Sequence, residues 1–300
     1  MTPDRASFAE LGENAALQRL LDHLSSNDRL IVGPGDDCAV VAGDDTYDLL
    51  LKTDVVIEGV HFTRDTPPEL IGRKALARTL SDIAAMGGQP DHALVTLLAH
   101  PSRAVRDAER LYDGMAELAE AFGVSIAGGE TSSLPADGLI INVALTGRVR
   151  RGKAVLRSGG RPGDTLCVSG KLGGSFESGR HLTFTPRLEL AEYLLSHDLR
   201  PGAMMDLSDG LGSDLPRLAA ASGCGYELDT EAIPCHPGIS VRHAISDGED
   251  YELLFTLDDA QLERLRRLEP PVPITPVGHL TRSSVTPLIS GWQHFIKLPL

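Results

Sequence analysis

The sequence predicts an α/β protein, in the broad sense that includes α+β folds, made of two domains. Segments typical of strands and of helices alternate along the chain, and the alternation begins again after an arginine- and glycine-rich stretch at residues 150–164. Mixed strands and helices on both sides of that stretch indicate two α/β or α+β units. A length of 300 residues is enough for two ordinary domains or one large one. We therefore expect an N-terminal domain at residues 1–149 and a C-terminal domain at residues 150–300.

The first of these halves has its clearest helix signal in the middle. Pro67 and Pro68 open a helix that runs to Met86, and Gly87 and Gly88 end it. The pattern predicts an amphipathic helix and two strands before it, and a strand, a helix and two further strands after it. The expected ranges are 7–24 for the amphipathic helix, 38–42 and 47–58 for the first strands, and 93–99, 103–122, 124–127 and 139–149 for the later elements.

The second half repeats this kind of pattern. A strand is expected at residues 165–169 and another at 251–257. Helices are expected at 186–196, 209–222 and 259–268. The chain therefore changes from one mixed unit to the next near residue 150.

The composition excludes several classes of protein. The net charge is −14, whereas a nucleic-acid-binding face needs clustered lysine and arginine, so we expect no nucleic-acid partner. No apolar run approaches the ~20 residues of a membrane span, and the polar N-terminus lacks the apolar core of a signal peptide. The cysteines form no C-x-x-C pair, and reduced thiols in a cytoplasmic protein are the simplest explanation for Cys38, Cys167, Cys224 and Cys235.

Acidic motifs recur along the whole length of the chain, each next to a glycine or a strand end. They are G-P-G-D-D at 33–37, K-T-D at 52–54, S-D at 81–82, G-G-E-T at 128–131 and D-L-S-D-G-L at 206–211. If the fold brings them together, one place holds Asp36, Asp37, Asp54, Asp82, Glu130, Asp206 and Asp209. Such a cluster repels itself and cannot be buried without cations. Hard oxygen ligands favour magnesium, which usually arrives with phosphates, so the motifs indicate nucleotide phosphoryl chemistry.

Each motif also has an ordinary structural explanation. The segment at 33–37 has the composition of an Asx-type turn. Lys52 and Asp54 face the same side of a strand and can form a salt bridge at a solvated strand end. Arg78 lies four residues before Asp82 and can form a modest surface pair with it. The G-G turn at 128–131, expected after the strand at 124–127, is either a phosphate and metal site or an ordinary loop.

The motif at 206–211 is more specific, because it places a strand end before a helix. Ser208 or Asp209 could cap that helix. The free N–H groups of the helix could instead hold a phosphate while Asp206 and Asp209 hold metal. Capping explains one acidic residue, but it does not explain two together with the serine.

Two further features suggest contact with a substrate. The acidic segment at 246–254 is either a solvated turn or a place where Glu249 or Asp250 contacts a cationic or amine-bearing substrate. Trp292 is the only tryptophan, and it either fills a core or stacks on a flat ring. There is no Walker A motif, no strand followed by G-x-G-x-x-G and no kinase-type H-R-D, so any use of ATP requires a different phosphate cradle.

In order and spacing, these motifs together resemble those of the thiamine-monophosphate kinases, a family of the aminoimidazole-ribonucleotide-synthetase-like superfamily. The resemblance extends from about Gly33 to Trp292 and includes E-G-V-H-F at 58–62 and G-K-A-V-L-R-S-G-G-R-P-G-D at 152–164. It is most specific in K-A-L-A-x-x-L-S-D-I-A-A-M-G at 74–87 and G-E-D-Y-E-L-L at 248–254.

The resemblance implies ATP-dependent phosphorylation of thiamine monophosphate to thiamine diphosphate, assisted by several magnesium ions. It also implies an N-terminal α/β domain that forms a homodimer through its sheet, followed by a C-terminal α/β domain. The implied catalytic residues are Asp82, Asp209 and Arg157. The implied metal ligands are Asp37, Thr53, Asp54, Asp82, Glu130, Asp206 and Asp209. The implied ATP contacts are Tyr112, Gly129, Glu130, Arg157 and Ser208, and the implied thiamine contacts are His61, Glu249 and Trp292.

The chemistry that the residues suggest agrees with this implication. The acceptor is already a phosphate anion, so the reaction requires no strong general base, and catalysis reduces to positioning two anions and neutralising charge. Metal ions together with Arg157 can do this.

Three residues depart from the family pattern. Lys52 stands where the family usually has serine or threonine, Glu130 replaces an aspartate, and Asp247 replaces a glycine. We expect Lys52 to supply part of the charge that metal otherwise supplies, and the alternative is that it extends into solvent and contacts nothing. The alternative functions are another ATP-using enzyme of the same superfamily, or a catalytically weakened nucleotide-binding homologue that acts as a partner protein.

Overall fold

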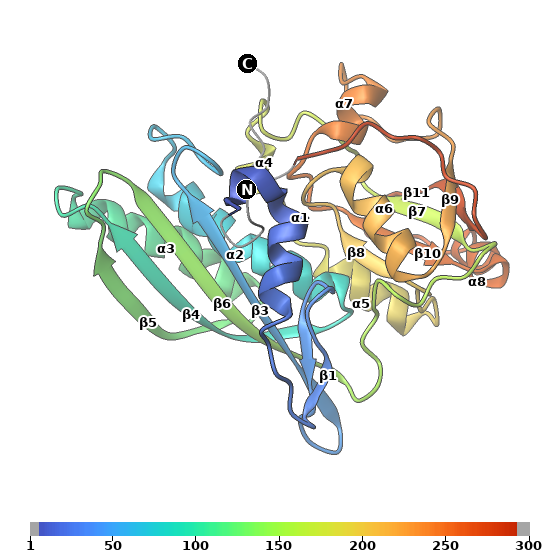
Figure 1. Cartoon of the computed structure of the whole chain (residues 1–300), viewed down its shortest axis with the longest axis horizontal. Coiled ribbons are helices and arrows are strands. Elements are labelled where there is room, and N and C mark those ends of the chain that lie inside the picture. Colours follow the sequence, from blue (N-terminus) through green and yellow to red (C-terminus); the bar gives the residue numbers. More distant parts are fainter. Residues whose placement is uncertain (1–5, 293–300) are drawn as a thin grey trace.

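The computed structural model describes residues 6–292, which form two β-sheets with helices packed against them (Figure 1). The first sheet has six strands in the order β1-β2-β3-β6-β4-β5, and all neighbouring strands are antiparallel except β4 and β5. Its strands are β1 Leu30–Val32, β2 Ala39–Val41, β3 Tyr47–Ile57, β4 Gln89–Ala99, β5 Ser125–Ser133 and β6 Leu139–Arg150.

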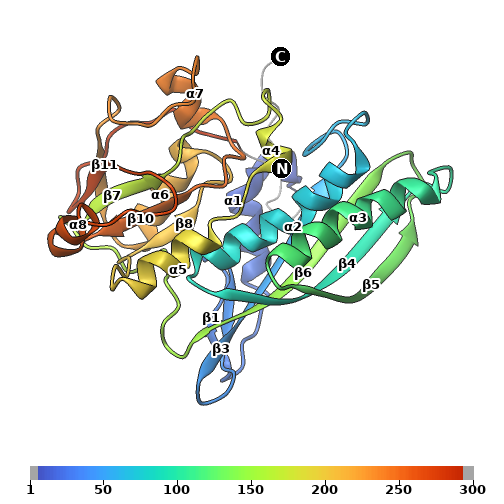
Figure 2. The same cartoon turned by 180° about the vertical axis from the view of Figure 1, so that it is seen from behind.

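Helices α2 (Pro68–Ala85) and α3 (Val105–Ala121) cover one face of the first sheet (Figure 2). Side chains alternate between the two faces of a strand, so Leu50 of β3 and Val143 of β6 are buried in the core beneath these helices. The opposite face carries apolar side chains that remain exposed, with exposed fractions of 38% for Leu49, 42% for Leu51 and 53% for Leu94. The first sheet is therefore apolar on both faces.

The second sheet has five antiparallel strands in the order β8-β10-β7-β11-β9. Both of its faces are covered, because Leu254 of β10 belongs to one hydrophobic core and the adjacent Phe255 to the other. Its strands are β7 Thr165–Ser169, β8 Met204–Asp206, β9 Gly225–Leu228, β10 Leu253–Leu257 and β11 Ile274–Thr281. The accompanying helices are α4 Arg180–Thr183, α5 Leu188–Ser196, α6 Leu211–Ala221, α7 Val241–Ser246 and α8 Asp259–Leu265.

Helix α2 connects the two sheets. Ile83 belongs to the core of the first sheet, whereas the adjacent Ala84 and Ala85 belong to a core of the second. The C-terminal end of α2 therefore lies between the sheets. This position brings Ser81 and Asp82 next to strand β8.

Helix α1 (Phe8–Leu21) lies beside both sheets near the middle of the molecule (Figure 1). A capping box of Ser7 and Glu10 begins it, and a non-helical Gly12 with φ of 70° interrupts it. Ala16 is its buried residue. Within residues 6–292, none of the helices combines the length and the apolar character needed to cross a membrane.

Several predicted elements are present with shifted ends. The predicted helix from Pro67–Pro68 to Met86 corresponds to α2, and the predicted strand at 139–149 corresponds to β6. The predicted helix at 7–24 is shorter and interrupted. The short elements β9, β11, α4 and α7 were not predicted as separate elements, because segments of four to eight residues show little periodicity.

Two predictions about the acidic motifs are wrong. The strand predicted at 124–127 extends to Ser133, so the G-G-E-T residues lie inside β5 and form no turn. A Cβ atom on Gly129 would lie 1.8 Å from the carbonyl oxygen of Val95, so this glycine is explained by close packing of β5 against β4. Helix α6 begins at Leu211 after Gly210, and neither Ser208 nor Asp209 caps it.

Candidate metal and phosphate site

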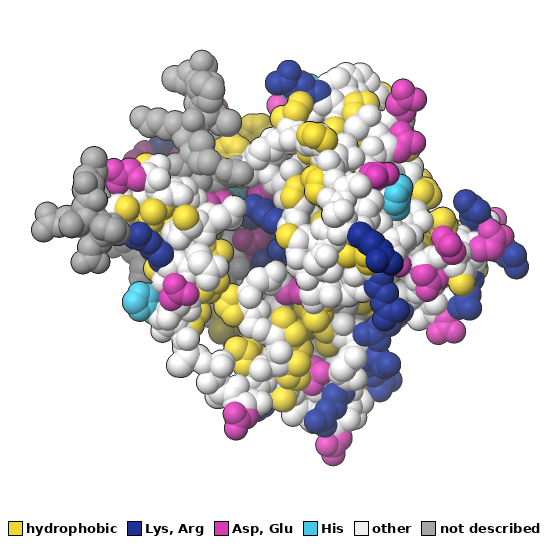
Figure 3. Space-filling model, turned by 45° about the vertical axis from the view of Figure 1, so that its right-hand side comes forward, with side chains coloured by type: hydrophobic (Ala, Val, Ile, Leu, Met, Phe, Trp, Pro, Cys, Tyr) yellow, Lys and Arg dark blue, Asp and Glu magenta, His cyan; other side chains and the backbone are white. Residues whose placement is uncertain are grey.

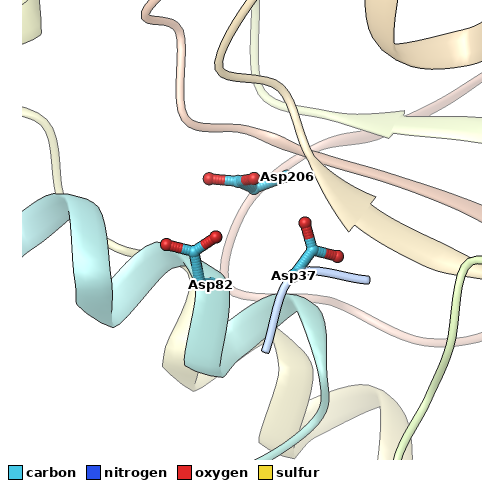
Figure 4. Close-up of side chains that lie close together, drawn as sticks. All are labelled: Asp37, Asp82 and Asp206. Carbon is cyan, nitrogen blue, oxygen red and sulfur yellow. The ribbon is translucent and has the colours of Figure 1, made fainter. Parts of the chain in front are cut away.

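Three aspartates from distant parts of the sequence meet between the two sheets (Figure 4). Asp37 precedes β2, Asp82 lies near the end of α2, and Asp206 ends β8. One carboxylate oxygen of each lies within 4.8 Å of the others. All three residues are buried, with exposed fractions of 2%, 5% and 3%. We call these residues the aspartate triad.

The triad carries more negative charge than its surroundings favour. Burial, together with the charge of Asp37, raises the pKa of Asp206 to about 6. Burial also raises the pKa of Asp82 above its usual range, although Lys52 opposes the shift. The Oδ2 atom of Asp37 is buried without a hydrogen-bond partner among the described residues. Oxygen ligands of this kind fit a hard divalent cation such as Mg²⁺.

Two cationic side chains already contact the triad. Lys52 Nζ lies 2.7 Å from Asp82 Oδ1, and the Arg157 guanidinium pairs with Asp37. Lys52 therefore does not extend freely into solvent, and that alternative is wrong. The Ser81 hydroxyl donates a hydrogen bond of 2.6 Å to Asp206.

Arg157 also presents an unused donor. Its backbone N–H donates to Asp36 Oδ2 over 3.1 Å, which fixes the loop between the sheets. Its Nε atom is buried without a hydrogen-bond partner in the described part of the chain. A guanidinium that neighbours a cation site and has an unused N–H is suited to bind a phosphate oxygen.

The seven carboxylates considered in the sequence do not converge in one chain. Asp36 faces Arg157 and the Asp37 backbone, with its Oδ1 atom accepting the Asp37 N–H over 3.0 Å in a local turn. Asp54 pairs with Arg78 at 3.2 Å, so the predicted pair between Arg78 and Asp82 is wrong. The remaining two, Asp209 and Glu130, lie outside the triad.

Asp209 belongs to a separate ion pair beside the triad. Its carboxylate pairs with Arg217, which also contacts the buried Asp214 at 2.9 Å. The backbone N–H of Asp209 donates to Asp214 Oδ2 over 3.0 Å. These contacts hold the loop between β8 and α6 in place, directly after Asp206.

Thr53 and Glu130 face away from the triad. Because side chains alternate along a strand, Thr53 points to the opposite face of β3 from Lys52 and Asp54, and its hydroxyl donates to Asn142 over 3.0 Å. Glu130 is exposed on β5, the edge strand farthest from the second sheet (Figure 1). Gly129 adjoins Glu130 in this strand, and Tyr112 lies on α3, packed against the core of the first sheet.

Two of the three residues assigned to thiamine contact the loop between β8 and α6. Glu249 donates its N–H to the Ser208 carbonyl over 2.7 Å, and Trp292 donates its N–H to the Asp209 carbonyl over 2.9 Å. The Trp292 residue is 41% exposed. His61 is buried, and its Nδ1 atom accepts the Ile57 N–H over 3.1 Å.

Lys74 joins His61 and Glu249, although the motifs assigned it no role. Its side chain is fully buried, and its Nζ atom donates to the His61 carbonyl and to Glu249 Oε2, each over 2.6 Å. The Ser175 hydroxyl donates to the Glu249 carbonyl over 2.7 Å. Glu249 has a φ of 64°, a conformation that side chains rarely adopt, and these contacts hold it there. The sequence feature that could have indicated a role for Lys74 is its position among the apolar residues of a predicted helix.

The surface is hollowed near the centre of Figure 3, where lysine or arginine side chains lie next to acidic ones. At the edge of the candidate site the side chains of Lys52 and Arg157 are 22% and 19% exposed, whereas the triad itself is buried.

Three comparisons place this geometry among known proteins. Residues 35–149 match the family model described as AIR synthase related protein, N-terminal domain. The chain is similar to the thiamine-monophosphate kinase of Rhodopirellula baltica, with 38% identity over 269 residues that cover 83% of each chain. It is also similar to the solved structure of AaThiL complexed with AMPPCP and TMP, at 31% identity and a TM-score of 0.83, covering 97% of this chain and 99% of that one. The likeness to the hydrogenase maturation protein HypE of E. coli, at 21% identity and a TM-score of 0.67 over 94% of this chain and 97% of that one, concerns the fold alone.

Proposed function

This chain belongs to the thiamine-monophosphate kinase family, and we propose that it transfers the γ-phosphoryl group of ATP to the phosphate of thiamine monophosphate. The products are ADP and thiamine diphosphate. The observation that carries the proposal is the buried triad beside Arg157, in which Asp37 Oδ2 and Arg157 Nε have no hydrogen-bond partner among the described residues. An unpartnered carboxylate oxygen fits a cation, and an unpartnered guanidinium N–H fits a phosphate.

The triad would hold Mg²⁺, with Asp37, Asp82 and Asp206 as ligands. When bound, Mg²⁺ would neutralise the charge of the phosphates and help to align them. The protein's own contribution is positional. Ser81 orients Asp206 through its hydrogen bond, and Arg157 stands next to Asp37 where it can bind an oxygen of the transferring group.

The thiamine end of the acceptor would bind near Glu249, His61 and Trp292. Thiamine carries a positively charged ring and an aminopyrimidine ring, so it suits a carboxylate together with an exposed indole. Ser208 links this region to the phosphates. It lies two residues after Asp206, and its carbonyl accepts a hydrogen bond from the Glu249 N–H. The acceptor phosphate is an anion at neutral pH, so none of these residues needs to act as a strong base.

We further propose that the protein acts as a homodimer, formed through the uncovered face of the first sheet. Leu49, Leu51 and Leu94 expose apolar side chains on that face, and an exposed apolar patch of this kind is typical of an interface. Thr53 and Glu130 share it, so each could serve the site of the second copy. Gly129 adjoins Glu130 in β5 and would also act across the dimer, whereas Tyr112, assigned to ATP with it, lies on α3 over the covered face of the sheet. The first sheet would form the dimerisation domain, with residues 150–300 as the second domain.

The dimer proposal has a direct test in subunit complementation. If one active site uses Asp82 of one copy and Glu130 of the other, a mixture of inactive Asp82→Asn and Glu130→Gln proteins recovers activity. Random mixing leaves about a quarter of the sites without either substitution. Two inactive proteins that remain inactive after mixing and verified subunit exchange would contradict this arrangement.

The function itself is tested by a coupled assay of ADP release, run with and without thiamine monophosphate. We expect release that depends on thiamine monophosphate, with thiamine diphosphate as the second product. ATP hydrolysis that is independent of thiamine monophosphate would favour another ATP-using enzyme of the superfamily. Binding of ATP without turnover would favour a weakened homologue.

The four cysteines are free thiols, which supports a cytoplasmic location.

A further inference from the structure

Lys52 occupies a position where a divalent cation would be expected. It lies on β3, the strand that faces the C-terminal half of α2, and its side chain is 22% exposed. Its Nζ atom lies 2.7 Å from Asp82 Oδ1, the distance of a direct ion pair. The ammonium therefore stands directly at the edge of the triad.

The fixed charges of the site are nearly balanced by the protein alone. The triad supplies three carboxylates, and Lys52 and Arg157 supply two cations in direct contact with it. Asp54, the next carboxylate along β3, is already paired with Arg78. When all of these groups are ionised, the triad retains a single unbalanced negative charge, so one divalent cation is enough to compensate it.

The geometry does not allow Lys52 and a metal ion to share the same oxygen freely. Mg²⁺ binds oxygen at about 2.0–2.1 Å in octahedral geometry, whereas the ammonium already lies 2.7 Å from Asp82 Oδ1. A metal ion at that atom must displace the ammonium or repel it at close range. The unpartnered oxygen of the triad is instead Asp37 Oδ2.

We propose that the Lys52 ammonium takes the place of one divalent cation at Asp82, so that the nucleotide-free protein binds one metal ion fewer than a variant without this charge. The inference rests on the proposed function only in that it assumes a metal site at the triad. It makes Lys52 a built-in cation of the active site, attached to β3 by its side chain and ion-paired with Asp82. The first ion then binds on the Asp37 and Asp206 side of the triad.

Direct binding of Mn²⁺, followed by electron paramagnetic resonance without nucleotide, tests the proposal. We compare the unmodified chain with Lys52→Met and Lys52→Thr, and use Lys153→Met, which removes an exposed lysine, as the matched control. We expect the two Lys52 variants to gain one bound Mn²⁺ per chain, or about tenfold tighter binding. The Lys153 variant should bind Mn²⁺ like the unmodified chain.

Thermal unfolding with and without Mg²⁺ gives a second readout. Lys52→Met leaves Asp82 without its partner, so this variant should be less stable without metal and should regain stability as Mg²⁺ is added. If Lys52→Met does not fold, the double variant Lys52→Met/Asp82→Asn removes both charges, and it should show no extra Mn²⁺ site.

The possible failures are distinguishable. Identical Mn²⁺ isotherms for the unmodified chain and the Lys52 variants would overturn the proposal and leave the kinase function standing. An extra site in the double variant would also overturn it, because that site could not depend on Asp82. Absence of Mn²⁺ binding in every protein would overturn this inference together with the metal site of the proposed function.

Discussion

Replacement of Lys74 by methionine tests how the thiamine region is held. Lys74 is fully buried and donates to Glu249 Oε2 and to the His61 carbonyl, each over 2.6 Å. Methionine keeps the approximate length of the side chain but removes the charge and both donors. The variant therefore leaves a carboxylate and a carbonyl oxygen without the partner that fixes them.

The magnitude follows from the burial of the pair. Removing one partner of a fully buried ion pair costs about 3–5 kcal/mol. The Glu249 side chain is 19% exposed and can recruit water, so we expect about 2–3 kcal/mol for this pair. For a protein of this size, that loss lowers the unfolding temperature by roughly 5–10 °C. The KM for thiamine monophosphate should rise about tenfold, which corresponds to ~1.4 kcal/mol, with a smaller change in kcat and in the KM for ATP.

The pH dependence gives an independent check. Burial lowers the pKa of Lys74 to about 8 from its ordinary 10.5, although Glu249 opposes the shift. Between these two values the unfolded chain holds the extra proton, so the contribution of Lys74 to stability rises with pH in that window. In the folded protein the bond to Glu249 changes around pH 8, where Lys74 loses its proton and no longer pairs with the carboxylate. The KM for thiamine monophosphate should therefore rise between pH 7 and pH 9 in the unmodified chain and stay flatter in Lys74→Met.

The measurements are steady-state kinetics with each substrate varied, and thermal unfolding, for the unmodified chain and four variants. Lys74→Met and Glu249→Gln are compared with their double variant, and Lys153→Met controls for loss of a lysine. In a double-mutant cycle, the two single effects should add to more than the effect of the double variant. Strictly additive effects, or an unchanged KM in Lys74→Met, would refute the role given to this pair.

Three further outcomes are expected. Asp82→Asn should lower the rate of phosphoryl transfer by at least ~100-fold. The metal-free variant should unfold at the same or a higher temperature, measured by calorimetry in a chelator. Near-normal turnover at saturating Mg²⁺ would contradict the role of the triad as a metal site. Trp292 emission should change on addition of thiamine monophosphate and much less on addition of ATP, and an unchanged spectrum together with normal activity of Trp292→Ala would exclude stacking. The pKa of Asp206 is raised to about 6 from 3.8, so its contribution to stability is present below pH 4 and is lost as pH rises through 6. The metal-free protein should therefore lose stability over that window, and Mg²⁺ should restore it. An Asp206→Asn variant with the same pH dependence would contradict the assignment of this loss to Asp206.

The sequence predicted the long, regular elements well and the short ones poorly. Helix α2 was visible because Pro67–Pro68 and Gly87–Gly88 flank it, and β6 because its apolar residues alternate. Strand β5 was cut short in the prediction because two adjacent glycines normally indicate a turn. In the fold these glycines pair with β4, which leaves no room for a side chain at Gly129.

The candidate site could be predicted as a set of motifs but not as a set of contacts. The sequence identifies Asp37, Asp82 and Asp206 as acidic residues beside turns and element ends, and the structure brings these three together. It gives no indication of which cation pairs with which carboxylate. Arg78 lies one helical turn before Asp82, yet it contacts Asp54 instead. These choices depend on how α2 is rotated against β3, which is set by apolar packing elsewhere.

Side chains alternate between the two faces of β3, so the three residues of the motif K-T-D divide between those faces. Lys52 and Asp54 face α2, so one contacts Asp82 and the other contacts Arg78 of the same helix. Thr53 faces the opposite side of the sheet, where it contacts Asn142 of β6. A motif of three adjacent residues on a strand therefore cannot direct all three side chains to one ion within a single chain. Either Thr53 contributes to a site completed by another copy of the chain, or its hydroxyl only stabilises the sheet. Glu130 lies on the same face, so the complementation experiment with Glu130→Gln separates these two roles.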